Sequence, residues 1–291
     1  MSSKVRKGYF VFFILLFLVL IPVVIFYSLG YNISLDKKFS FFKTGGISIY
    51  PSEPGVIVSL NGKEEGRTSI FEHSVLIKSL SPGQYNVSVT KDGYRQWDKT
   101  ITVLEEKVSE GFPLLLPQNL TPILLSGTST ASSTELTNSY NEAIALFTPP
   151  TPVKKIKIPS TETATVTPES LGITNHKVLL YKDDGVIKVR WLGKMEEIPY
   201  FFCFLVSEGN TCNASFIAYK AKDLRDISFF PGRNDVVIFS AGNAVSVVEL
   251  DRRAPEFFMA LYKGKMPDFR IGKDDVLYIK DDGLLYKIDL S

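Results

Sequence analysis

One uncharged apolar run, from Tyr9 to Leu29, constrains this chain more than any other feature of its sequence. A helix needs about 20 apolar residues to cross the hydrocarbon core of a bilayer, and this run has that length. Pro22 is compatible with such a helix, because a membrane helix tolerates a proline kink. The run predicts a transmembrane helix over residues 9–29, through which the chain binds the lipid bilayer.

The basic residues before this run set its expected orientation. Lys4, Arg6 and Lys7 precede it, and lysine and arginine concentrate on the cytoplasmic side of membrane segments. We therefore expect residues 1–8 in the cytoplasm, a juxtamembrane linker over residues 30–44, and the remaining bulk outside. This describes a single-pass protein of the cell membrane.

A cleaved signal peptide is the alternative. Ser28 and Gly30 would be the small residues before a cut at Tyr31. The apolar stretch of a signal peptide is about 7–15 residues long, however, and this one is longer. Both interpretations place the body of the chain in an extracytoplasmic compartment.

Charge and cysteine content exclude two classes of protein. The formal net charge is +2, and three positive charges flank the apolar run. Nucleic-acid binding needs lysine and arginine clustered on one face, so no nucleic-acid partner is expected. Only Cys203 and Cys212 are present, so the fold is not a disulfide scaffold. In an oxidising compartment the two would pair across a hairpin turn; two unpaired buried thiols are the alternative.

Residues 45–117 have the pattern of short strands separated by turns. Asn61-Gly62 is a favoured two-residue hairpin sequence, and the Ser-Pro-Gly-Gln sequence at 81–84 suits a type II turn. From Tyr85 to Thr90 apolar and polar residues alternate, as in a half-buried strand. Regular spacing of such strands predicts a small all-β sandwich.

This region also resembles a known family through the order of its short motifs: Gly46–Ile49, Pro54–Val56, Leu60–Gly62, Gly66–Thr68, Leu80–Val87, Lys91–Tyr94 and Leu114–Pro117. The order is similar to that of the PEGA domain, a small β-sandwich of prokaryotic envelope and surface proteins. The chain departs from the family at Gly55-Val56, where Gly-Ala is common, and at Thr68-Ser69, where Thr-Pro is common. The resemblance implies a non-catalytic surface module and no particular ligand.

Two aromatic residues of this region are candidates for ligand contact. Tyr94 and Trp97 would stack on a saccharide ring if their side chains were exposed together. The competing interpretation is that both pack in the core or at an edge of the sandwich.

A repeat organises residues 118–291. Val178–Leu192, Val236–Leu250 and Val276–Leu290 align without gaps as strand, tight turn and strand. A period of about 40–45 residues with four strands per unit is typical of β-propellers. Ser228–Gly232 resembles the strand–turn signature of TolB and WD40-type blades. We therefore predict a β-propeller-like domain, with an inserted hairpin around the two cysteines.

The number of blades stays open at this level. Residues 142–148 and 153–158 are expected to form a further strand pair, which gives three to four blades where closed propellers have about 4–8. Pro122–Leu125 is predicted to complete the last blade, and an open stack is the alternative. The Ser/Thr-rich segments 126–140 and 159–169 are predicted to be loops.

No catalytic, cofactor or metal motif is recognisable. His73 and His176 have no second ligand at metal spacing, and no nucleophile elbow or Walker loop occurs. The Asp-Asp-Gly sequences at 183–185 and 281–283 fit turns between strands, because calcium loops need more oxygen ligands at fixed spacing. Four Asn-x-Ser/Thr sequences are potential glycan acceptors in an organism that glycosylates exported proteins: Asn32, Asn86, Asn119 and Asn213.

These observations favour an extracytoplasmic, non-catalytic binding or scaffold protein of the prokaryotic cell envelope. It would bind an envelope protein or polysaccharide, with the sandwich as a spacer and the propeller-like region as a recognition platform. An envelope polysaccharide-processing enzyme is the alternative, but such enzymes usually need two positioned carboxylates, and no pair can be nominated. A sensor is disfavoured, because only Met1 to Gly8 would face the cytoplasm.

Overall fold

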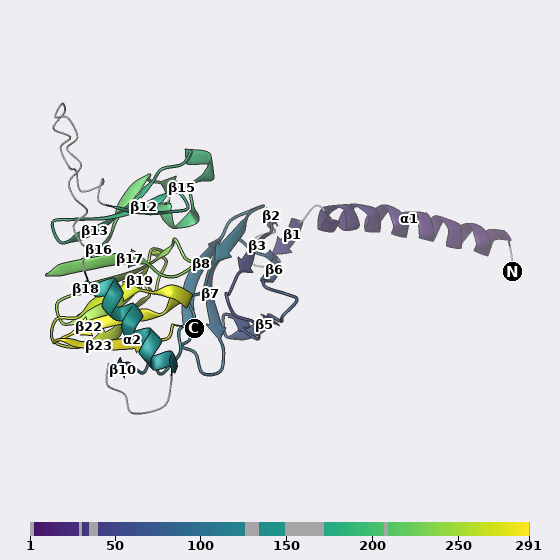
Figure 1. Ribbon diagram of the computed structural model, residues 1–291. Helices are drawn as coiled ribbons and strands as arrows, with labels where there is room; N and C mark the ends of the chain where they lie inside the picture. Colours follow the sequence, from purple (N-terminus) through teal and green to yellow (C-terminus); the bar gives the residue numbers. More distant parts are fainter. Residues whose placement is uncertain are drawn as a thin grey trace. The chain divides into compact units, whose positions relative to one another are not determined.

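The computed structural model describes residues 3–28, 31–34, 40–125, 134–148, 172–206 and 209–290. The chain divides into two units, and we describe each by itself. The first contains residues 1–92 and 96–115, and the second contains residues 93–95 and 116–291. Apart from two α-helices and short 3-10 turns, the described regular structure is β, so the fold is mostly β and not entirely β as predicted (Figure 1).

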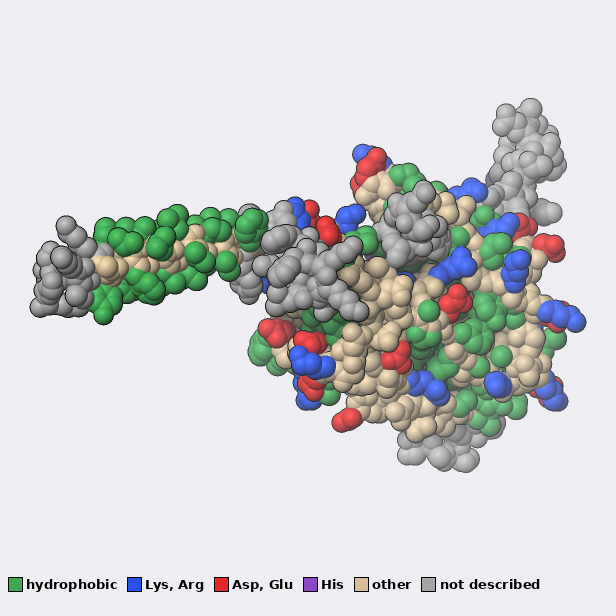
Figure 2. All heavy atoms as spheres, turned by 180° about the vertical axis from the view of Figure 1, so that it is seen from behind, with side chains coloured by type: hydrophobic (Ala, Val, Ile, Leu, Met, Phe, Trp, Pro, Cys, Tyr) green, Lys and Arg blue, Asp and Glu red, His purple; other side chains and the backbone are tan. Residues whose placement is uncertain are grey.

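The first helix, α1 (Ser3–Ser28), contains the apolar run and Pro22. Its stretch Gly8–Phe26 has a mean hydropathy of 3.1, and it is long and apolar enough to cross a membrane. Hydrophobic side chains cover its exposed surface (Figure 2). A helix of this kind occurs in membrane anchors and in signal sequences. After α1, β1 (Tyr31–Ser34) and β2 (Ser40–Lys43) pair antiparallel where only a linker was expected.

Two sheets form the sandwich of the first unit. One has the strand order β6-β3-β9 and the other β5-β4-β7-β8. Gly111, at the end of β9, shows how closely they pack: a methyl group there would lie 3.3 Å from the Trp97 ring in the opposite sheet. The strands are β3 (Gly45–Ile49), β4 (Ile57–Leu60), β5 (Lys63–Arg67), β6 (Val75–Leu80), β7 (Gly83–Thr90), β8 (Trp97–Val103) and β9 (Val108–Gly111).

The sandwich follows from the local sequence signals. Asn61 and Gly62 have φ angles of 50° and 84°, the left-handed pair that a two-residue hairpin turn needs. The last strand ends at Gly111, before the predicted end of the sandwich at residue 117, and Leu114–Leu116 are buried without forming a strand. Beyond them, Pro117 pairs with Tyr94 in an isolated bridge of the second unit.

The first and last strands of the sandwich are parallel neighbours. Gly46 lies opposite Val108, and Ile49 lies opposite Gly111. Both strands therefore run in the same direction along the sandwich. The chain enters β3 at one end of the sandwich and leaves β9 at the other end.

The described part of the second unit contains three four-stranded antiparallel sheets. We call them the first sheet (β11-β12-β13-β16), the middle sheet (β17-β18-β19-β20) and the third sheet (β10-β23-β22-β21). Their strands are β10 (Ile123–Leu125), β11 (Ile173–Asn175), β12 (Val178–Asp183), β13 (Val186–Trp191), β16 (Ser215–Lys220), β17 (Leu224–Phe229), β18 (Val236–Ala241), β19 (Ala244–Glu249), β20 (Phe258–Lys263), β21 (Asp268–Ile271), β22 (Leu277–Asp281) and β23 (Leu284–Ile288).

Each aligned repeat forms the two inner strands of one sheet, joined by the expected tight turn. Asp184 and Gly185 have φ angles of 45° and 71°, and Asp282 and Gly283 have 51° and 81°. Two successive positive φ angles are what a type I′ hairpin turn needs. The strand–turn–strand prediction is therefore correct for these repeats.

The third sheet is completed from a distant part of the chain, as predicted. In β10, Ile123 lies opposite Lys287 and Leu125 lies opposite Leu285 of β23. The last repeat thereby becomes a four-stranded sheet. The described strands make three such sheets, and they do not by themselves establish a closed propeller.

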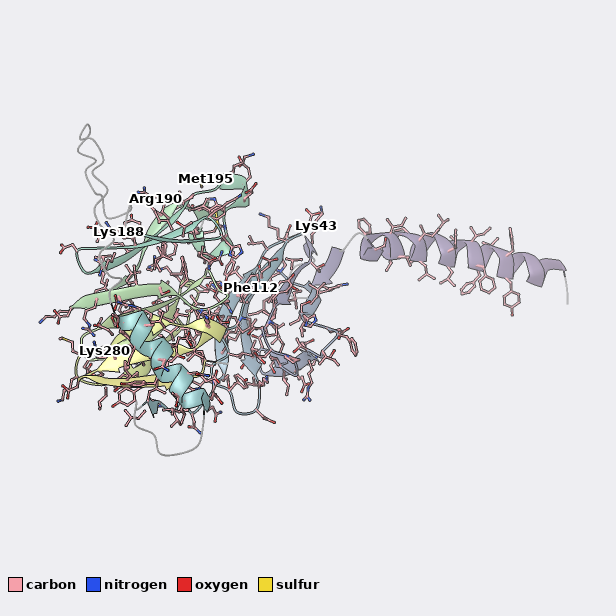
Figure 3. All side chains as sticks on the ribbon, viewed as in Figure 1. Lys43, Phe112, Lys188, Arg190, Met195 and Lys280 are labelled. Carbon is pink, nitrogen blue, oxygen red and sulfur yellow. A yellow bond between two sulfur atoms is a disulfide. The ribbon has the colours of Figure 1, made fainter. Side chains whose placement is uncertain are left out.

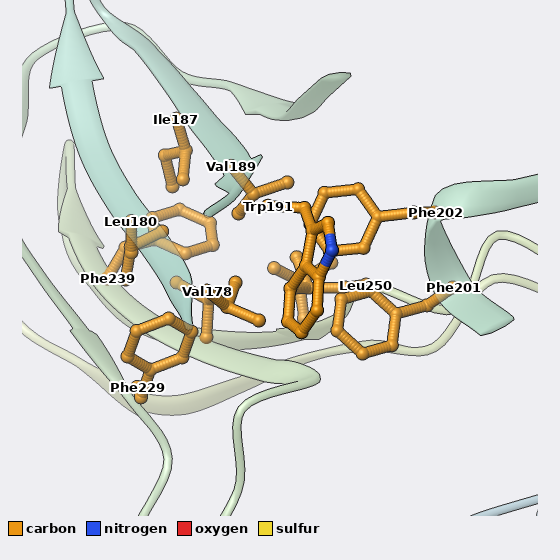
Figure 4. Packing of buried hydrophobic residues seen from close by; sticks show 12 residues of the cluster. Val178, Leu180, Ile187, Val189, Trp191, Phe201, Phe202, Phe229, Phe239 and Leu250 are labelled. Carbon is orange, nitrogen blue, oxygen red and sulfur yellow. The ribbon is translucent and has the colours of Figure 1, made fainter. Parts of the chain in front are cut away.

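Apolar side chains join the first sheet to the middle sheet. Figure 4 shows Leu180 of β12 beside Phe239 of β18, and Trp191 beside Phe201 and Phe202. Phe201 and Phe202 belong to a 3-10 turn (Tyr200–Phe202). This turn leads into a hairpin formed by β14 (Cys203–Val206) and β15 (Gly209–Cys212). This hairpin is inserted between β13 and β16, as the excess spacing around the cysteines predicted.

The helix α2 (Thr134–Phe147) corrects two predictions. Residues 134–140 are not a loop, and residues 142–148 are not a strand. The apolar residues Leu136, Tyr140, Ala143 and Phe147 have the spacing of one helical face, and this face packs on Leu125, Tyr278 and Leu285 of the third sheet. The helical period was missed because it begins inside the Ser/Thr-rich segment.

The other predictions for this stretch lie outside the described residues. These are the remaining part of the first Ser/Thr-rich segment (126–133), the strand at 153–158 and the segment 159–169.

Helix α2 is also held in position by a residue of its polar face. Glu142 accepts hydrogen bonds from the Lys273 backbone nitrogen at 2.7 Å and from the Tyr278 hydroxyl at 3.1 Å.

Candidate functional site

The cysteine pair lies at the base of the inserted hairpin. Cys203 and Cys212 are directly opposite each other in β14 and β15, and their sulfurs form a disulfide. Of the two alternatives that the sequence left open, the structure contains the bonded pair. Phe201 and Phe202, immediately before it, are buried in the core between the first and middle sheets. The disulfide therefore closes a hairpin whose base is part of that core.

The predicted aromatic platform is not formed. Trp97 is only 1% exposed, because residues alternate between core and surface along β8 and Trp97 shares the core side with Ile101. Its indole cannot stack on a saccharide ring. Tyr94 is half-buried, and its backbone oxygen accepts a hydrogen bond from the Gln118 side chain. The interpretation of Trp97 as a core residue is the correct one.

A different aromatic pair is brought together in the sandwich. Tyr50 comes directly after β3 and Phe112 directly after β9, and their rings stack with centroids 5.2 Å apart and an interplanar angle of 18°. The parallel pairing of these strands places the two rings side by side, and the Tyr50 nitrogen donates to the Gly111 oxygen at 2.9 Å. The sequence contains no local signal for this pair, because it depends on a pairing between distant strands.

The acidic turn sequences serve the fold. Asp281 accepts hydrogen bonds from the backbone nitrogens of Lys265 (3.0 Å) and Met266 (2.9 Å) and from the Tyr262 hydroxyl (3.2 Å). Burial opposes ionisation of Asp281, but these hydrogen bonds outweigh it and lower the pKa of the carboxyl below its usual value. Its carboxylate is thus used within the turn.

The remaining metal-ligand candidates are also dispersed. In the other acidic turn, Asp183 pairs with Lys188 (labelled in Figure 3) at 2.7 Å. His73 and His176 are both exposed. Within the part of the chain that the structure describes, no three His, Cys, Asp or Glu residues are arranged to hold a metal ion.

One buried group of ionisable side chains was not recognised from the sequence. We call it the charge cluster, and it lies in the second unit between the 3-10 turn and the ends of β18 and β19. Its members are Tyr200, Arg233, Asp235, Glu249, Asp251 and Arg253. The three carboxylate residues are buried, with exposures of 6% for Asp235, 6% for Glu249 and 4% for Asp251.

Two arginine–aspartate pairs organise this cluster. Arg233 donates from Nε and Nη2 to the two oxygens of Asp235, at 2.7 and 2.8 Å. Arg253 donates to Asp251 in the same manner, with its shortest bond at 2.6 Å, and its guanidinium lies 4.9 Å from the centre of the Tyr200 ring. Such two-pronged pairs are the strongest form of arginine–carboxylate contact.

The pKa shifts in the cluster follow from these contacts. Burial raises the pKa of Tyr200 well above its ordinary value, and the carboxylates of Asp235 and Asp251 raise it further. Burial alone would lower the pKa of Arg233 and of Arg253, but hydrogen bonding to the aspartates raises both. Both arginines therefore remain charged and paired. The arrangement is one of fixed ion pairs.

A second group of ion pairs links the middle and third sheets. Arg225 of β17 donates to Asp268 of β21 at 2.9 Å, and Arg270 of β21 donates to Asp226 of β17 at 2.8 Å. β17 and β21 are edge strands of their sheets. Each strand therefore contributes one arginine and one aspartate to the ion pairs between the two edges. These four residues are partly exposed, so this edge is a polar surface of the second unit.

Sequence reasoning could have found part of these groups. Arg233 and Asp235 are two residues apart in the sequence, and Asp251 and Arg253 have the same spacing. Side chains two apart in an extended segment lie on the same face, so this spacing permits each local pair. Nothing in it indicates that both pairs meet Tyr200, because that contact depends on the packing of two sheets.

Comparison with known proteins identifies the sandwich. Residues 44–112 match the model of the PEGA domain, and the match begins just before β3 and ends just after β9. A comparison with curated proteins gave no match. The first unit of this chain therefore contains a sandwich that is similar to PEGA domains, a type of module that suggests an extracellular binding or scaffold role.

Proposed function

We propose that this chain is a single-pass membrane protein that displays a non-catalytic binding or scaffold module in the prokaryotic cell envelope, outside the cytoplasmic membrane. The order of its parts supports the proposal: an apolar helix comes first, and a PEGA-type sandwich begins within about twenty residues of its end. The basic residues before the helix favour a cytoplasmic N-terminus.

The observation that carries the proposal is the parallel pairing of β3 and β9. The first strand of the sandwich, β3, follows the apolar helix in the sequence, and it starts at one end of the sandwich. The last strand, which leads to the second unit, finishes at the opposite end. A module connected in this manner separates the segments on its two sides. This connection supports the role that we propose for the sandwich, a spacer near the membrane.

The second unit would supply the binding surface. Its three sheets have the strand order of propeller blades, and we interpret them as an open, propeller-like stack. Val236, Val237 and Ile238 are consecutive and fully buried, so both faces of the middle sheet are covered. Helix α2 covers one face of the third sheet. A rigid stack of this kind can present its strand edges and loops to an envelope protein or polysaccharide.

The location is tested by protease accessibility of the full chain carrying a C-terminal epitope. Protease added to intact cells, or to spheroplasts if an outer layer excludes it, should remove the epitope. A cytoplasmic protein should stay intact in the same sample. Protection of the epitope until the cells are lysed would overturn the proposed topology.

The binding role is tested with the full chain in lipid nanodiscs. Purified envelope polysaccharide and solubilised envelope proteins are passed over the loaded discs, over empty discs and over discs carrying heat-denatured chain. Saturable retention on the folded chain alone supports the proposal. Equal retention on all three supports, or turnover of the polysaccharide, would contradict a non-catalytic binding module.

A further inference from the structure

The structure separates the four Asn-x-Ser/Thr sequences by their local environment. The side chain of Asn32 is outside the described part of the chain. Of the other three, Asn119 and Asn213 lie in irregular segments of the second unit, whereas Asn86 lies within β7. An acceptor asparagine must reach the active site of a transferase as part of an accessible surface segment.

Asn119 projects from a short connection whose backbone is anchored on both sides. Before it, the Gln118 nitrogen donates to the Gly93 oxygen at 2.8 Å; after it, β10 begins at Ile123. Asn119 and Thr121, the two residues that define the motif, are both exposed. Among the residues that the structure describes, none makes a side-chain hydrogen bond with Asn119. Its amide is therefore free to react.

Asn213 has a comparable setting next to the disulfide. Its backbone nitrogen donates to the Phe202 oxygen at 3.0 Å, which holds the main chain in place. The side chains of Asn213 and Ser215 are exposed, and no described residue hydrogen-bonds to the Asn213 amide. The motif thus lies on a fixed support with its reactive group directed outward.

Asn86 is exposed as well, but its strand is paired on both sides. Its backbone exchanges hydrogen bonds with Asn61, and its Oδ1 accepts one from the Thr100 hydroxyl at 3.1 Å. A transferase would have to lift β7 away from β4 and β8 to bind this motif. Breaking these bonds lowers the accessible fraction by at least about tenfold.

We propose that Asn119 and Asn213 are acceptor sites for an oligosaccharide carried on a polyprenyl diphosphate, and that Asn86 is not. The Nδ2 atom of asparagine bonds to the anomeric carbon of the sugar while the bond from that carbon to the diphosphate oxygen breaks. The diphosphate leaves with the bonding electron pair and stays on the lipid, and one amide proton passes to a base of the transferase. Use of these sites in the cell rests on the extracytoplasmic location proposed above.

The test uses the purified full chain in detergent micelles. It is incubated with a single-subunit transferase that recognises Asn-x-Ser/Thr and with a polyprenyl diphosphate-linked oligosaccharide, and site occupancy is measured by peptide mass spectrometry. A reporter Asn-Ala-Thr sequence appended to the C-terminus provides an acceptor outside the fold. The variants Thr121→Ala and Ser215→Ala keep each asparagine and remove only the hydroxyl of the motif.

We expect occupancy of Asn119 and Asn213 near that of the reporter, and occupancy of Asn86 lower by at least about tenfold. Each hydroxyl variant should abolish transfer at its own site and leave the other unchanged. Transfer to the reporter with none to Asn119 and Asn213, or equal transfer to Asn86, would overturn the inference. Because the assay contains no intact membrane, such a failure leaves the topology experiment unaffected.

Discussion

Replacing Asp235 by alanine tests whether the charge cluster stabilises the second unit. The Asp235 side chain is 8% exposed and that of Arg233 is 17% exposed, and two hydrogen bonds of 2.7 and 2.8 Å join them. Removing one partner of a buried pair leaves the other charge without full compensation. Such a loss costs about 3–5 kcal/mol, which corresponds to a factor of about 100 or more in the unfolding equilibrium.

The chain offers a control pair with a similar contact distance but different burial. Lys177 and Glu197 lie 2.8 Å apart, and their side chains are 59% and 52% exposed. Exposed pairs contribute about 0–1 kcal/mol. Lys177→Ala should therefore change stability little, although the distance is nearly the same as in the buried pair.

The assay is urea unfolding of the full chain in detergent micelles, followed by tryptophan fluorescence. The chain has two tryptophans, Trp97 in the sandwich and Trp191 in the second unit. A Trp97→Phe background in every variant makes the emission report on the second unit alone. The double variant Arg233→Met with Asp235→Ala should recover part of the loss, because it no longer leaves a buried charge.

Two results would refute this reasoning. One is a loss for Asp235→Ala no larger than that for Lys177→Ala, which would mean that burial does not set the strength of the pair. The other is a double variant that loses as much stability as Arg233→Met and Asp235→Ala lose together when each is measured alone, which would mean that the two residues do not act as a pair.

Four further changes have defined outcomes. Replacing Cys203 and Cys212 by alanine should lower the free energy of unfolding of the second unit by about 2.6 kcal/mol. This is the loop-closure entropy of a disulfide between residues with a sequence separation of 9. A reductant should destabilise the original chain but have no effect on this variant. The pKa of Asp281 is lowered in the folded state, so its carboxylate stabilises the fold at neutral pH. The stability lost in Asp281→Asn should therefore be constant near neutral pH and vanish as the pH falls through the folded pKa, below about 4. A loss of stability that grows in acid would contradict the assignment. Trp97→Ala should destabilise the sandwich by about 3–5 kcal/mol in calorimetry, whereas a surface residue would cost little. Leu125→Ala should cost about 2–5 kcal/mol and speed amide exchange in β23, and unchanged exchange would mean that β10 does not support the third sheet.

The elements that sequence reasoning predicted correctly are those with local signals. The apolar run identified α1 by length alone, and Asn61-Gly62, Asp184-Gly185 and Asp282-Gly283 located hairpins because their backbone conformations favour these residues. The placement of β10 was also predictable, since the last repeat lacked one strand. Helix α2 was missed because its apolar face is sparse and begins in a segment rich in serine and threonine.

The candidate site residues depended on information that is not local. Whether Trp97 faces solvent or core is decided by which face of β8 meets the opposite sheet, and Tyr94 is only half-buried although it lies three residues away. The stacked pair of Tyr50 and Phe112 needs the parallel register of β3 and β9.

The apolar helix, the strand–turn–strand repeats and the resemblance of residues 45–117 to a known module could be read from the sequence alone, because periodicity and turn conformation are properties of short segments. Which side chains are buried together depends on how the sheets pack on one another. The charge cluster shows the physical reason: the pairing of Arg233 with Asp235 is local, but the burial that makes it costly to break comes from distant parts of the chain. One of these is Tyr200, whose hydroxyl donates to Asp235 at 3.3 Å.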